Sequence, residues 1–265
     1  IIYVLRCFEN DDITHVSGKV DPIADFEVVE TELMLADMES LEKRKAGVVK
    51  KANSGDKEAK AQVALIDLAL VELNAGRPAR RAVISKDDTR AWNMLQLLTS
   101  KPVLFVANVD EDSAATGNEY SKRVEARAAE EGAACVVISA QIEAELALLD
   151  EPDRSEYLET LGLEEPGLTR LIHTGYNLLD LQTYFTVGPK EARAWTIRKG
   201  WSAPKAAGVI HGDFEKGFIR AETVAYKDYV EYGGEAGAKE AGKMRSEGKE
   251  YIVQDGDVML FRFNV

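Results

Sequence analysis

The chain has 265 residues and is acidic, with 33 Lys and Arg against 46 Asp and Glu and a formal net charge of −13. Its 45% hydrophobic and 30% charged residues are typical of a globular protein, and no apolar run approaches the roughly 20 residues that cross a bilayer. The excess negative charge is concentrated in residues 1–21 and 85–177, which excludes a protein that binds nucleic acid through its overall charge.

Three nearly continuous apolar runs, rich in Val and Ile, lie at residues 1–8, 103–109 and 134–139. Such runs are typical of parallel strands that are covered on both faces. Helical patterns at 121–131 and 168–179 accompany them, and Gly132 is placed to end the first of these helices. The alternation of strand and helix predicts a doubly wound α/β domain.

A long helical insertion separates the first two predicted strands. Apolar residues recur at helical spacing over 23–53 and again over 56–74, and Ser54-Gly55 interrupts the pattern. Two long helices joined by a tight turn predict an antiparallel hairpin. A further helix is expected to begin at Ser85, whose hydroxyl can cap it, with Asp88 completing a capping box.

The C-terminal residues, 178–265, have a different character. Segments 183–187 and 192–197 flank Gly188-Pro189 and predict a β-hairpin, a short helix is expected over 204–210, and strands are expected at 221–226 and 258–265. Mixed strands around one helix in fewer than 100 residues favour a small α+β module of the β-grasp type. The two cysteines, Cys7 and Cys135, lie in apolar runs, which favours reduced thiols and a cytoplasmic protein over a disulfide.

The most informative motif follows the second predicted strand, where the chain reads Asn108-Val109-Asp110-Glu111. GTP-binding proteins recognise guanine at this place with Asn-Lys-x-Asp, so Val109 replaces the lysine and Glu111 replaces the aspartate. The motif therefore predicts a nucleotide-binding protein with weakened guanine selectivity. No Gly-x-x-x-x-Gly-Lys-Ser/Thr phosphate loop occurs in the sequence.

Several specific motifs together resemble the YchF family, also called Obg-like ATPases, which are P-loop NTPases of the TRAFAC class that carry a TGS domain. The resemblance spans the whole chain. The segments that carry it are 6–10 (RCFEN), 15–20 (HVSGKV), 108–111 (NVDE), 162–168 (GLEEPGL), 181–186 (LQTYFT), 213–221 (DFEKGFIRA) and 242–245 (GKMR).

The resemblance implies three parts: the C-terminal portion of a nucleotide-binding G domain at 1–21 and 85–177, an inserted coiled-coil hairpin at 22–84, and a TGS domain at 178–265. It implies that the phosphate loop and the switch regions precede Ile1 and that the 265 residues alone are inactive. For the complete protein it implies Mg²⁺-dependent hydrolysis of ATP, with GTP used more weakly, a ribosome or RNA partner, no membrane contact and a monomeric state. The loop residue His15 is a candidate stand-in for the water-orienting Gln of GTPases, and a surface or packing His is the alternative.

The base site can be argued from the side chains. Glu111 places its carboxylate roughly 1.5 Å farther out than Asp would, which spoils the paired hydrogen bonds to guanine. Asn108 can offer both edges of its amide to adenine, and the apolar Val109 suits the face of the ring. Ser139 and the backbone N–H of Ala140 are further candidates after the third strand, although Ser139 is equally suited to cap a helix.

Two basic groups are candidates for RNA contact, the run Lys43, Arg44, Lys45 in the hairpin and the pair Lys243, Arg245 in the C-terminal module. For the hairpin run the alternative is a solvated helix face paired with nearby glutamates. The aromatic residues Phe214 and Phe218 are expected to fill a small core. An alternative function for the whole chain is a non-catalytic module that binds RNA or the ribosome. No Cys/His cluster indicates zinc.

Overall fold

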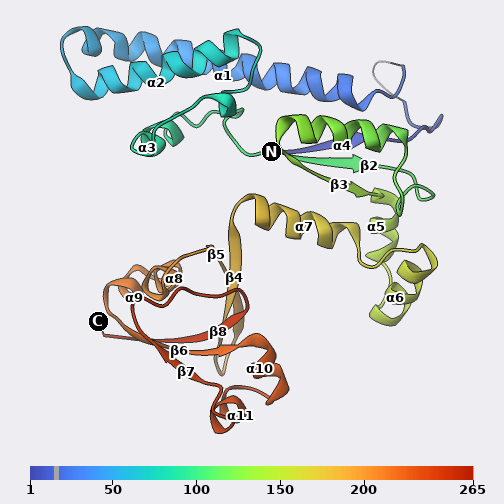
Figure 1. Cartoon of the computed structure of the whole chain (residues 1–265), viewed down its shortest axis with the longest axis vertical. Helices are drawn as coiled ribbons and strands as arrows, with labels where there is room; N and C mark the ends of the chain where they lie inside the picture. Colours follow the sequence, from blue (N-terminus) through green and yellow to red (C-terminus); the bar gives the residue numbers. More distant parts are fainter. Residues whose placement is uncertain (15–17, 265) are drawn as a thin grey trace. The chain divides into compact units, whose positions relative to one another are not determined.

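The computed structural model describes residues 1–14 and 18–264, and His15 therefore lies outside the described residues. The chain divides into two compact units, Ile1–Thr174 and Gly175–Val265. Figure 1 shows the order of the elements along the chain.

The first unit is built on a parallel sheet of β1 (Ile2–Arg6), β2 (Leu104–Asn108) and β3 (Ala134–Ile138), with β2 in the centre. The register places Val4 beside Val106 and Val106 beside Val136. Helix α4 (Glu119–Glu131) packs on β2 and β3, and the start of α1 (Pro22–Asn53) packs on β1. The predicted parallel strands are confirmed.

The expectation that every strand is covered on both faces is wrong for β1. Tyr3 and Leu5 are buried against the helices, whereas Ile2 is 54% and Val4 is 63% exposed. Successive side chains of a strand point to opposite faces, and in the structure only the face that carries Tyr3 and Leu5 is packed by α1 and α4. A continuous apolar run therefore does not report how many faces are covered.

The predicted helical hairpin is formed by α1 and α2 (Lys57–Asn74), which lie alongside each other in Figure 1. Asp21 and Asp56 cap the two helices through their carboxylates, which accept the N–H groups of Ala24 and Ala59. Between the helices, Gly55 adopts φ 100°, a left-handed conformation that favours glycine. Local chemistry thus defines the start of both helices and the turn between them.

After the hairpin the chain forms a short 3₁₀ turn, η1 (Ala79–Arg81), and then α3 (Thr89–Asn93). The prediction that a helix begins at Ser85 is wrong. The Ser85 hydroxyl accepts the N–H of Asp88 at 3.1 Å and donates to its carboxylate at 2.7 Å. These bonds close a local turn, and side-chain bonds of this kind compete with continuation of a helix.

Two further helices belong to the first unit, α5 (Ala140–Leu146) and α6 (Glu151–Thr160). Helix α7 (Gly167–Leu178) contains the boundary between the units. Asn118 and Ser121 form a capping box at the start of α4, and Gly132 ends that helix at φ 66°, as predicted. Asn118 also donates from Nδ2 to the carbonyl of Cys7 at 2.6 Å, which ties α4 to the end of β1.

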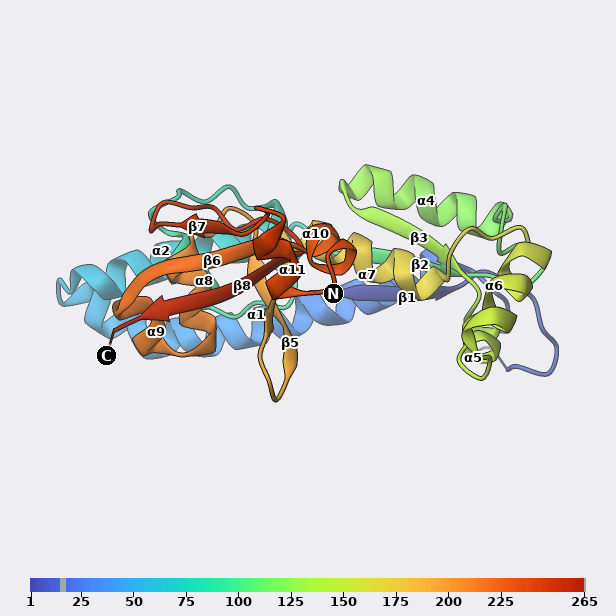
Figure 2. The ribbon, with the colours of Figure 1, turned by 90° about the horizontal axis from the view of Figure 1, so that it is seen from below.

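The second unit is a mixed five-stranded sheet in the order β5-β4-β8-β6-β7. Its strands are β4 (Leu181–Val187), β5 (Ala192–Arg198), β6 (Phe218–Ala225), β7 (Arg245–Glu247) and β8 (Asp257–Phe263). Strand β4 runs parallel to β8, and the other pairs are antiparallel. The predicted hairpin of β4 and β5 is confirmed, and Figure 2 shows it projecting from the sheet.

Helix α8 (Ala203–Ile210) covers the core of this unit, as expected, and Phe218 lies in that core while Phe214 stacks on Phe263. Sequence reasoning missed β7 and three short helices: α9 (Gly212–Lys216), α10 (Tyr226–Glu231) and α11 (Glu235–Glu240). Among the described residues of the whole chain, no helix combines the length and apolar character needed to cross a bilayer.

Candidate functional site

The candidate site lies at the carboxyl ends of β2 and β3. Ligands of open parallel sheets bind outside these ends, because the loops that leave neighbouring strands meet there. Two backbone bonds hold the ends together. The N–H of Cys7 donates to the carbonyl of Asn108 at 2.7 Å, and the N–H of Val109 donates to the carbonyl of Ile138 at 2.8 Å. The first residues of all three loops therefore have fixed positions relative to one another.

Asn108 is held by the loop that follows β3. Its Oδ1 accepts the backbone N–H of Ala140 at 2.9 Å. Its Nδ2 has no hydrogen-bond partner among the described residues. The prediction that Asn108 offers both amide edges to a base is therefore modified: the oxygen already holds Ala140 and keeps one lone pair, whereas the nitrogen retains its donors for a ligand.

Ser139 and Ala140 serve this arrangement structurally. The buried Ser139 is the N-cap of α5, and its hydroxyl faces the N–H of Ile142 at 3.5 Å. This geometry matches the alternative interpretation of Ser139 as a helix cap. The N–H of Ala140, one of the first in α5, has no partner within the helix and is satisfied by Asn108 instead.

Val109 does not lie where a ring-covering side chain is needed. It is 2% exposed and belongs to the core that contains Cys7 and Val124. The prediction that Val109 covers the face of a base is therefore wrong. The reason is the alternation along β2: Phe105, Ala107 and Val109 share the core-facing side, whereas Asn108 points to the other face.

The two acidic residues of the motif have different surroundings. Asp110 accepts the N–H of Ser113 at 2.9 Å and so closes the turn after β2. Glu111 is partly exposed, and no described residue donates a hydrogen bond to its carboxylate. The Glu111 carboxylate interacts electrostatically with Tyr157 of α6, which donates to Glu145 of α5.

Hydrogen bonding to Glu145 raises the pKa of Tyr157 to about 12, and burial and the carboxylates of Glu145 and Glu111 add to the shift. Tyr157 thus lies within the electrostatic influence of two carboxylates, those of Glu145 and Glu111. Sequence reasoning missed Glu145 and Tyr157, and no motif marks them, because α5 and α6 bring them to Glu111 only through folding.

Arg6 organises the loop at the end of β1, beside Asn108 in the register. Its guanidinium donates to the carbonyls of Phe8, Asn10 and Ile13 at 2.9–3.1 Å and lies 4.9 Å from the centroid of the Phe8 ring. Three bonds from one side chain shape a loop that has little secondary structure. Arg6 lies in a motif that the sequence analysis identified, but its role in holding this loop was not predicted.

The basic residues of the helical hairpin contact other residues of the same unit. Lys43 pairs with Glu39 at 2.6 Å, and Lys45 reaches across the hairpin to Asp67 at 2.6 Å. Arg44 donates to the carbonyl of Met94 at 3.0 Å. These contacts agree with a solvated, internally paired helix face, which was the alternative interpretation of this run.

Lys243 and Arg245 also lie close to carboxylates of their own unit. Arg245 lies 3.3 Å from the buried Asp257 and 3.2 Å from Glu247, and it donates to the hydroxyl of Tyr251 at 2.9 Å. Lys243 lies 3.7 Å from Asp228. Arg245 therefore compensates a buried charge of the second unit.

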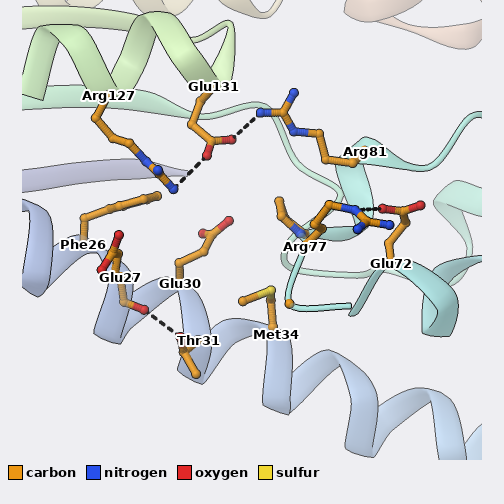
Figure 3. A pocket seen from close by; sticks show the side chains of 12 residues that line it. Phe26, Glu27, Glu30, Thr31, Met34, Glu72, Arg77, Arg81, Arg127 and Glu131 are labelled. Atoms are coloured by element: carbon orange, nitrogen blue, oxygen red, sulfur yellow. Dashed lines mark hydrogen bonds and ion pairs between the residues drawn. The ribbon is translucent and has the colours of Figure 1, made fainter. Parts of the chain in front are cut away.

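A cavity of about 690 Å³ lies between α1, the end of α2 and α4 (Figure 3). Glu131 of α4 accepts contacts from three arginines: Arg81 at 3.0 Å, Arg127 at 3.1 Å and Arg80 at 3.4 Å. Arg80 also lies 2.7 Å from Glu30 of α1, and Tyr3 donates to Glu30. We call this set the α1–α4 ion network; it links the base of the helical hairpin to α4.

No group of three or more His, Cys, Asp or Glu side chains in residues 1–14 and 18–264 is arranged to hold a metal ion. Hydrogen-bonding groups rather than a metal cluster therefore characterise the ends of β2 and β3 in the described part of the chain.

Comparison with known proteins identifies relatives over nearly the whole chain. The chain is 54% identical over 263 residues to "Ribosome-binding ATPase YchF" of Haemophilus ducreyi, covering 99% of this chain and 72% of the relative. It is 52% identical over 267 residues to the protein of the same name from Bacillus subtilis, covering 100% and 73%. Residues 181–264 match the YchF-GTPase_C family, described as "Protein of unknown function (DUF933)".

Solved structures give the same result. The Schizosaccharomyces pombe YchF GTPase superposes with a TM-score of 0.82 at 36% identity, covering 98% of this chain and 71% of that chain. A GTP-binding protein from Pyrococcus horikoshii superposes with a TM-score of 0.59 at 19% identity, covering 98% and 77%, and this likeness concerns the fold alone.

Proposed function

Since this chain belongs to the YchF family, we propose that it binds the base of a nucleoside triphosphate through Asn108 and Glu111, that the protein hydrolyses ATP in preference to GTP, and that it couples its nucleotide state to ribosome binding. The mixed α/β fold suits this role. The observation that carries the proposal is the Asn108–Ala140 bond at the carboxyl end of the sheet.

That bond supports base recognition because it fixes the orientation of the carboxamide. With Oδ1 held by Ala140, Nδ2 is a donor with a defined position, and it can donate to N7 of a purine. The N6 amine of adenine needs an acceptor, which the remaining lone pair of Asn108 Oδ1 or the carboxylate of Glu111 supplies. Positions fixed before binding reduce the ordering cost of recognition.

The weakened selectivity for guanine rests on the chemistry of Glu111, whereas the preference for ATP is supported by the name that the relatives carry. Guanine requires a carboxylate that accepts from N1–H and the N2 amine together, and the additional methylene of Glu111 displaces its oxygens by roughly 1.5 Å from the position of an aspartate. Loss of a paired polar contact weakens selectivity strongly. Adenine has no N2 amine and presents N1 as an acceptor, so Glu111 cannot pair with that edge as an aspartate pairs with guanine.

Hydrolysis needs a phosphate cradle and Mg²⁺ as well as a base site. When bound, Mg²⁺ would neutralise charge that develops on the phosphates. We assign it no ligand, because no cluster of metal-binding side chains occurs in the described part of the chain. The contribution proposed for these residues is therefore to bind and select the base.

The base-binding proposal is tested by titrating adenosine, ATP and guanosine into ¹⁵N-labelled protein. We expect adenosine to move the backbone amide signals of Asn108, Glu111 and Ala140, with an affinity near the millimolar range that base contacts alone allow. Asn108→Ala should abolish these shifts. The matched control is Asn53→Ala, at the exposed end of α1. Shifts that persist in Asn108→Ala would contradict the proposal.

Ribosome binding is the second half of the proposal, and its support is the name that the bacterial relatives carry. Such a role would place the protein in the cytoplasm. Co-sedimentation of the chain with purified 70S ribosomes, with and without ATP, tests it. Absence of the chain from the ribosomal pellet under both conditions would argue against this half and leave the base site untouched.

A further inference from the structure

Strand β3 is an outer strand of the parallel sheet, because the strand order is β1-β2-β3 (Figure 2). The carbonyl of Ile138 faces β2, since it accepts the N–H of Val109 at 2.8 Å. Backbone groups of successive residues point to opposite edges of a strand. The N–H and C=O groups of Cys135 and Val137 therefore point away from β2, and they form the row of hydrogen-bonding groups that an edge strand presents.

One of these four groups already has a partner. Arg170 of α7 donates from Nη2 to the carbonyl of Val137 at 3.0 Å, and this bond agrees with a carbonyl that points out of the sheet. Elsewhere in residues 1–14 and 18–264, no group is hydrogen-bonded to the outward N–H and C=O of Cys135 or to the N–H of Val137. Two donors and one acceptor therefore remain for another chain in extended conformation, which carries the same groups at the same spacing.

A groove of about 440 Å³ lies along this edge. The parts of the first unit that line it include residues 114–117 of the loop after β2, residues 135–137 of β3, Glu125, Glu165 and Arg170. Cys135 and Val137 are partly exposed, although their side chains pack on the core. The groove thus leaves the backbone edge of β3 open to a partner.

The unpaired charge beside the groove is negative. Glu125 and Glu165 form no ion pair among the residues that the structure describes, and the guanidinium of Arg170 is held at the carbonyl of Val137. The sequence segments to which the sheet belongs, 1–21 and 85–177, contain 10 basic and 22 acidic residues. Opposite charges favour association and like charges oppose it, so the groove suits a basic segment better than a second copy of this acidic chain.

We propose that the outer edge of β3 binds an extended, basic segment of a partner protein, which adds to the sheet as a further strand. Main-chain hydrogen bonds to Cys135 and Val137 supply the affinity, as they do wherever a peptide joins an exposed sheet edge. Lysine or arginine side chains of the partner face Glu125 and Glu165 and supply the selectivity. This site uses the side of the sheet, whereas the base site uses the carboxyl ends of its strands.

Protection of the sheet edge is the alternative role for this arrangement. Proteins prevent strands of separate molecules from pairing by placing charged side chains at an edge, and the contact of Arg170 with Val137 has that form. A protected edge binds neither basic nor acidic peptides. The proposed site binds a basic peptide and discriminates against an acidic one, so the two roles lead to different results.

The experiment titrates the chain into a fluorescein-labelled peptide of about six residues that alternates Lys and Val, a length that matches β3, and follows anisotropy. A second peptide alternates Glu and Val. The basic peptide should bind with a Kd below about 1 mM, and the acidic one at least about tenfold more weakly. Hydrogen exchange of the Cys135 and Val137 amides should slow about fivefold or more with saturating basic peptide, because both N–H groups gain an acceptor.

Val137→Pro tests the backbone contact. It removes an outward N–H but no hydrogen bond to β2, and an edge strand tolerates proline at such a position. Loss of one hydrogen bond should weaken binding of the basic peptide about tenfold. The matched control is Val4→Pro at the opposite edge of the sheet. The N–H of Val4 also points away from β2, because Ile1, three positions earlier, faces β2 and accepts the N–H of Leu104. This control should leave binding within about twofold.

A second pair of variants tests the charge. Glu125→Lys with Glu165→Lys should weaken binding of the basic peptide about tenfold. The matched control is Glu119→Lys with Glu130→Lys, which makes the same change in net charge at exposed positions of α4 outside the groove. It should leave binding within about twofold.

Thermal unfolding of every variant identifies loss of fold. If Val137→Pro does not fold, the exchange measurement and the charge variants decide the result. Absence of binding by the basic peptide, equal binding of the two peptides, or unchanged exchange at Cys135 and Val137 would each overturn the proposal. Equal losses in a variant and its matched control would overturn it as well, because binding would then lie elsewhere on the chain.

Discussion

The carboxamide oxygen of Asn108 accepts the backbone N–H of Ala140 at 2.9 Å, across 32 positions of sequence. One residue thereby joins the end of β2 to the start of α5. The two polar atoms of this side chain have different roles: the oxygen holds the fold, and the nitrogen remains available to a ligand. A substitution that changes only the nitrogen can therefore separate stability from binding.

Asn108→Asp is expected to do so. It keeps an oxygen for Ala140 but replaces the Nδ2 donor by an acceptor, so base binding should fall at least tenfold, which corresponds to about 1.4 kcal/mol, the range of one hydrogen bond. The melting temperature should stay close to that of the parent. Asn108→Ala, which removes both groups, should lose binding and about 1 kcal/mol of stability. Equal melting temperatures for the Ala variant and the parent would contradict a structural role of Oδ1.

Glu111→Asp is expected to shift base preference toward guanine. Shortening the side chain returns the carboxylate to the distance at which it accepts from N1–H and the N2 amine. The ratio of guanosine to adenosine affinity should rise about tenfold or more by competitive titration. The control is Asp110→Glu, the reciprocal change at the neighbour that closes the turn. It should leave the ratio of guanosine to adenosine affinity unchanged. A rise of that ratio in the control would show that the geometry of the loop, rather than the reach of the carboxylate, sets the base preference.

Val109→Lys is expected to destabilise the protein rather than restore guanine binding. The side chain lies in the core beside Cys7 and Val124, where an ammonium group would be buried without a partner. We expect a loss of about 3 kcal/mol or more in urea unfolding, against about 1–2 kcal/mol for Val109→Ala. A folded Lys variant with the parent's stability would show that Val109 can leave the core.

Glu131→Gln is expected to weaken the α1–α4 ion network. Removing the carboxylate leaves Arg80 and Arg81 facing a neutral amide. Because the Glu131 side chain is largely buried, the free energy of unfolding should fall by about 2 kcal/mol. Glu130→Gln is the matched control, because Glu130 lies next in sequence but is largely exposed; its unfolding midpoint should not change. Equal midpoints for the two variants would mean that the network contributes no stability.

The two thiols are expected to react slowly in the folded protein. Burial raises the pKa of Cys7 to about 12 and that of Cys135 to about 11. At pH 8 the reactive thiolate of Cys135 should be about 100-fold scarcer than in an unfolded chain. Reaction with a disulfide reagent should therefore be slow at pH 8, accelerate toward pH 10, and become fast in urea.

The raised pKa values also have a consequence for stability. The folded state favours the protonated thiols. Their contribution to the free energy of unfolding is therefore fully present below the pKa of an unfolded cysteine, and it is lost as the pH rises through the pKa values of the folded state. Stability should thus decline on the alkaline side. Rapid modification of both thiols at pH 8 in buffer would contradict their burial.

Sequence reasoning was most successful where structure depends on neighbouring residues. The parallel strands, the two hairpin helices and the β4–β5 hairpin were predicted from periodicity, and Gly132 was placed correctly as a helix end. The helix ends and the turns depend on residues a few positions apart, and apolar runs marked the individual strands, whereas the pairing of β1 with β2 joins distant segments, for example Ile2 with Leu104. The Ser85 turn shows the limit, since the same hydroxyl bond that starts a helix also closes an isolated turn.

The candidate site was predicted in part. Asn108 and Glu111 were identified from a motif, but the burial of Val109 was missed, although the alternation of β2 already placed it with Ala107. Glu145 and Tyr157, beside Glu111, carried no signal in the sequence. The pairing of Arg245 with Asp257 was missed as well, because that aspartate is buried only in the folded sheet.

The sequence by itself determined the three parallel strands, the helical hairpin, the family and the position of the motif at residues 108–111, because local patterns of apolar, capping and turn residues indicate them. Tertiary structure alone decided which polar groups remain available. Asn108 keeps a donor because Ala140 occupies its oxygen, whereas Arg245 is paired because the buried Asp257 lies beside it. Partners of this kind come from distant segments, and only the packing of sheets and helices brings them within reach.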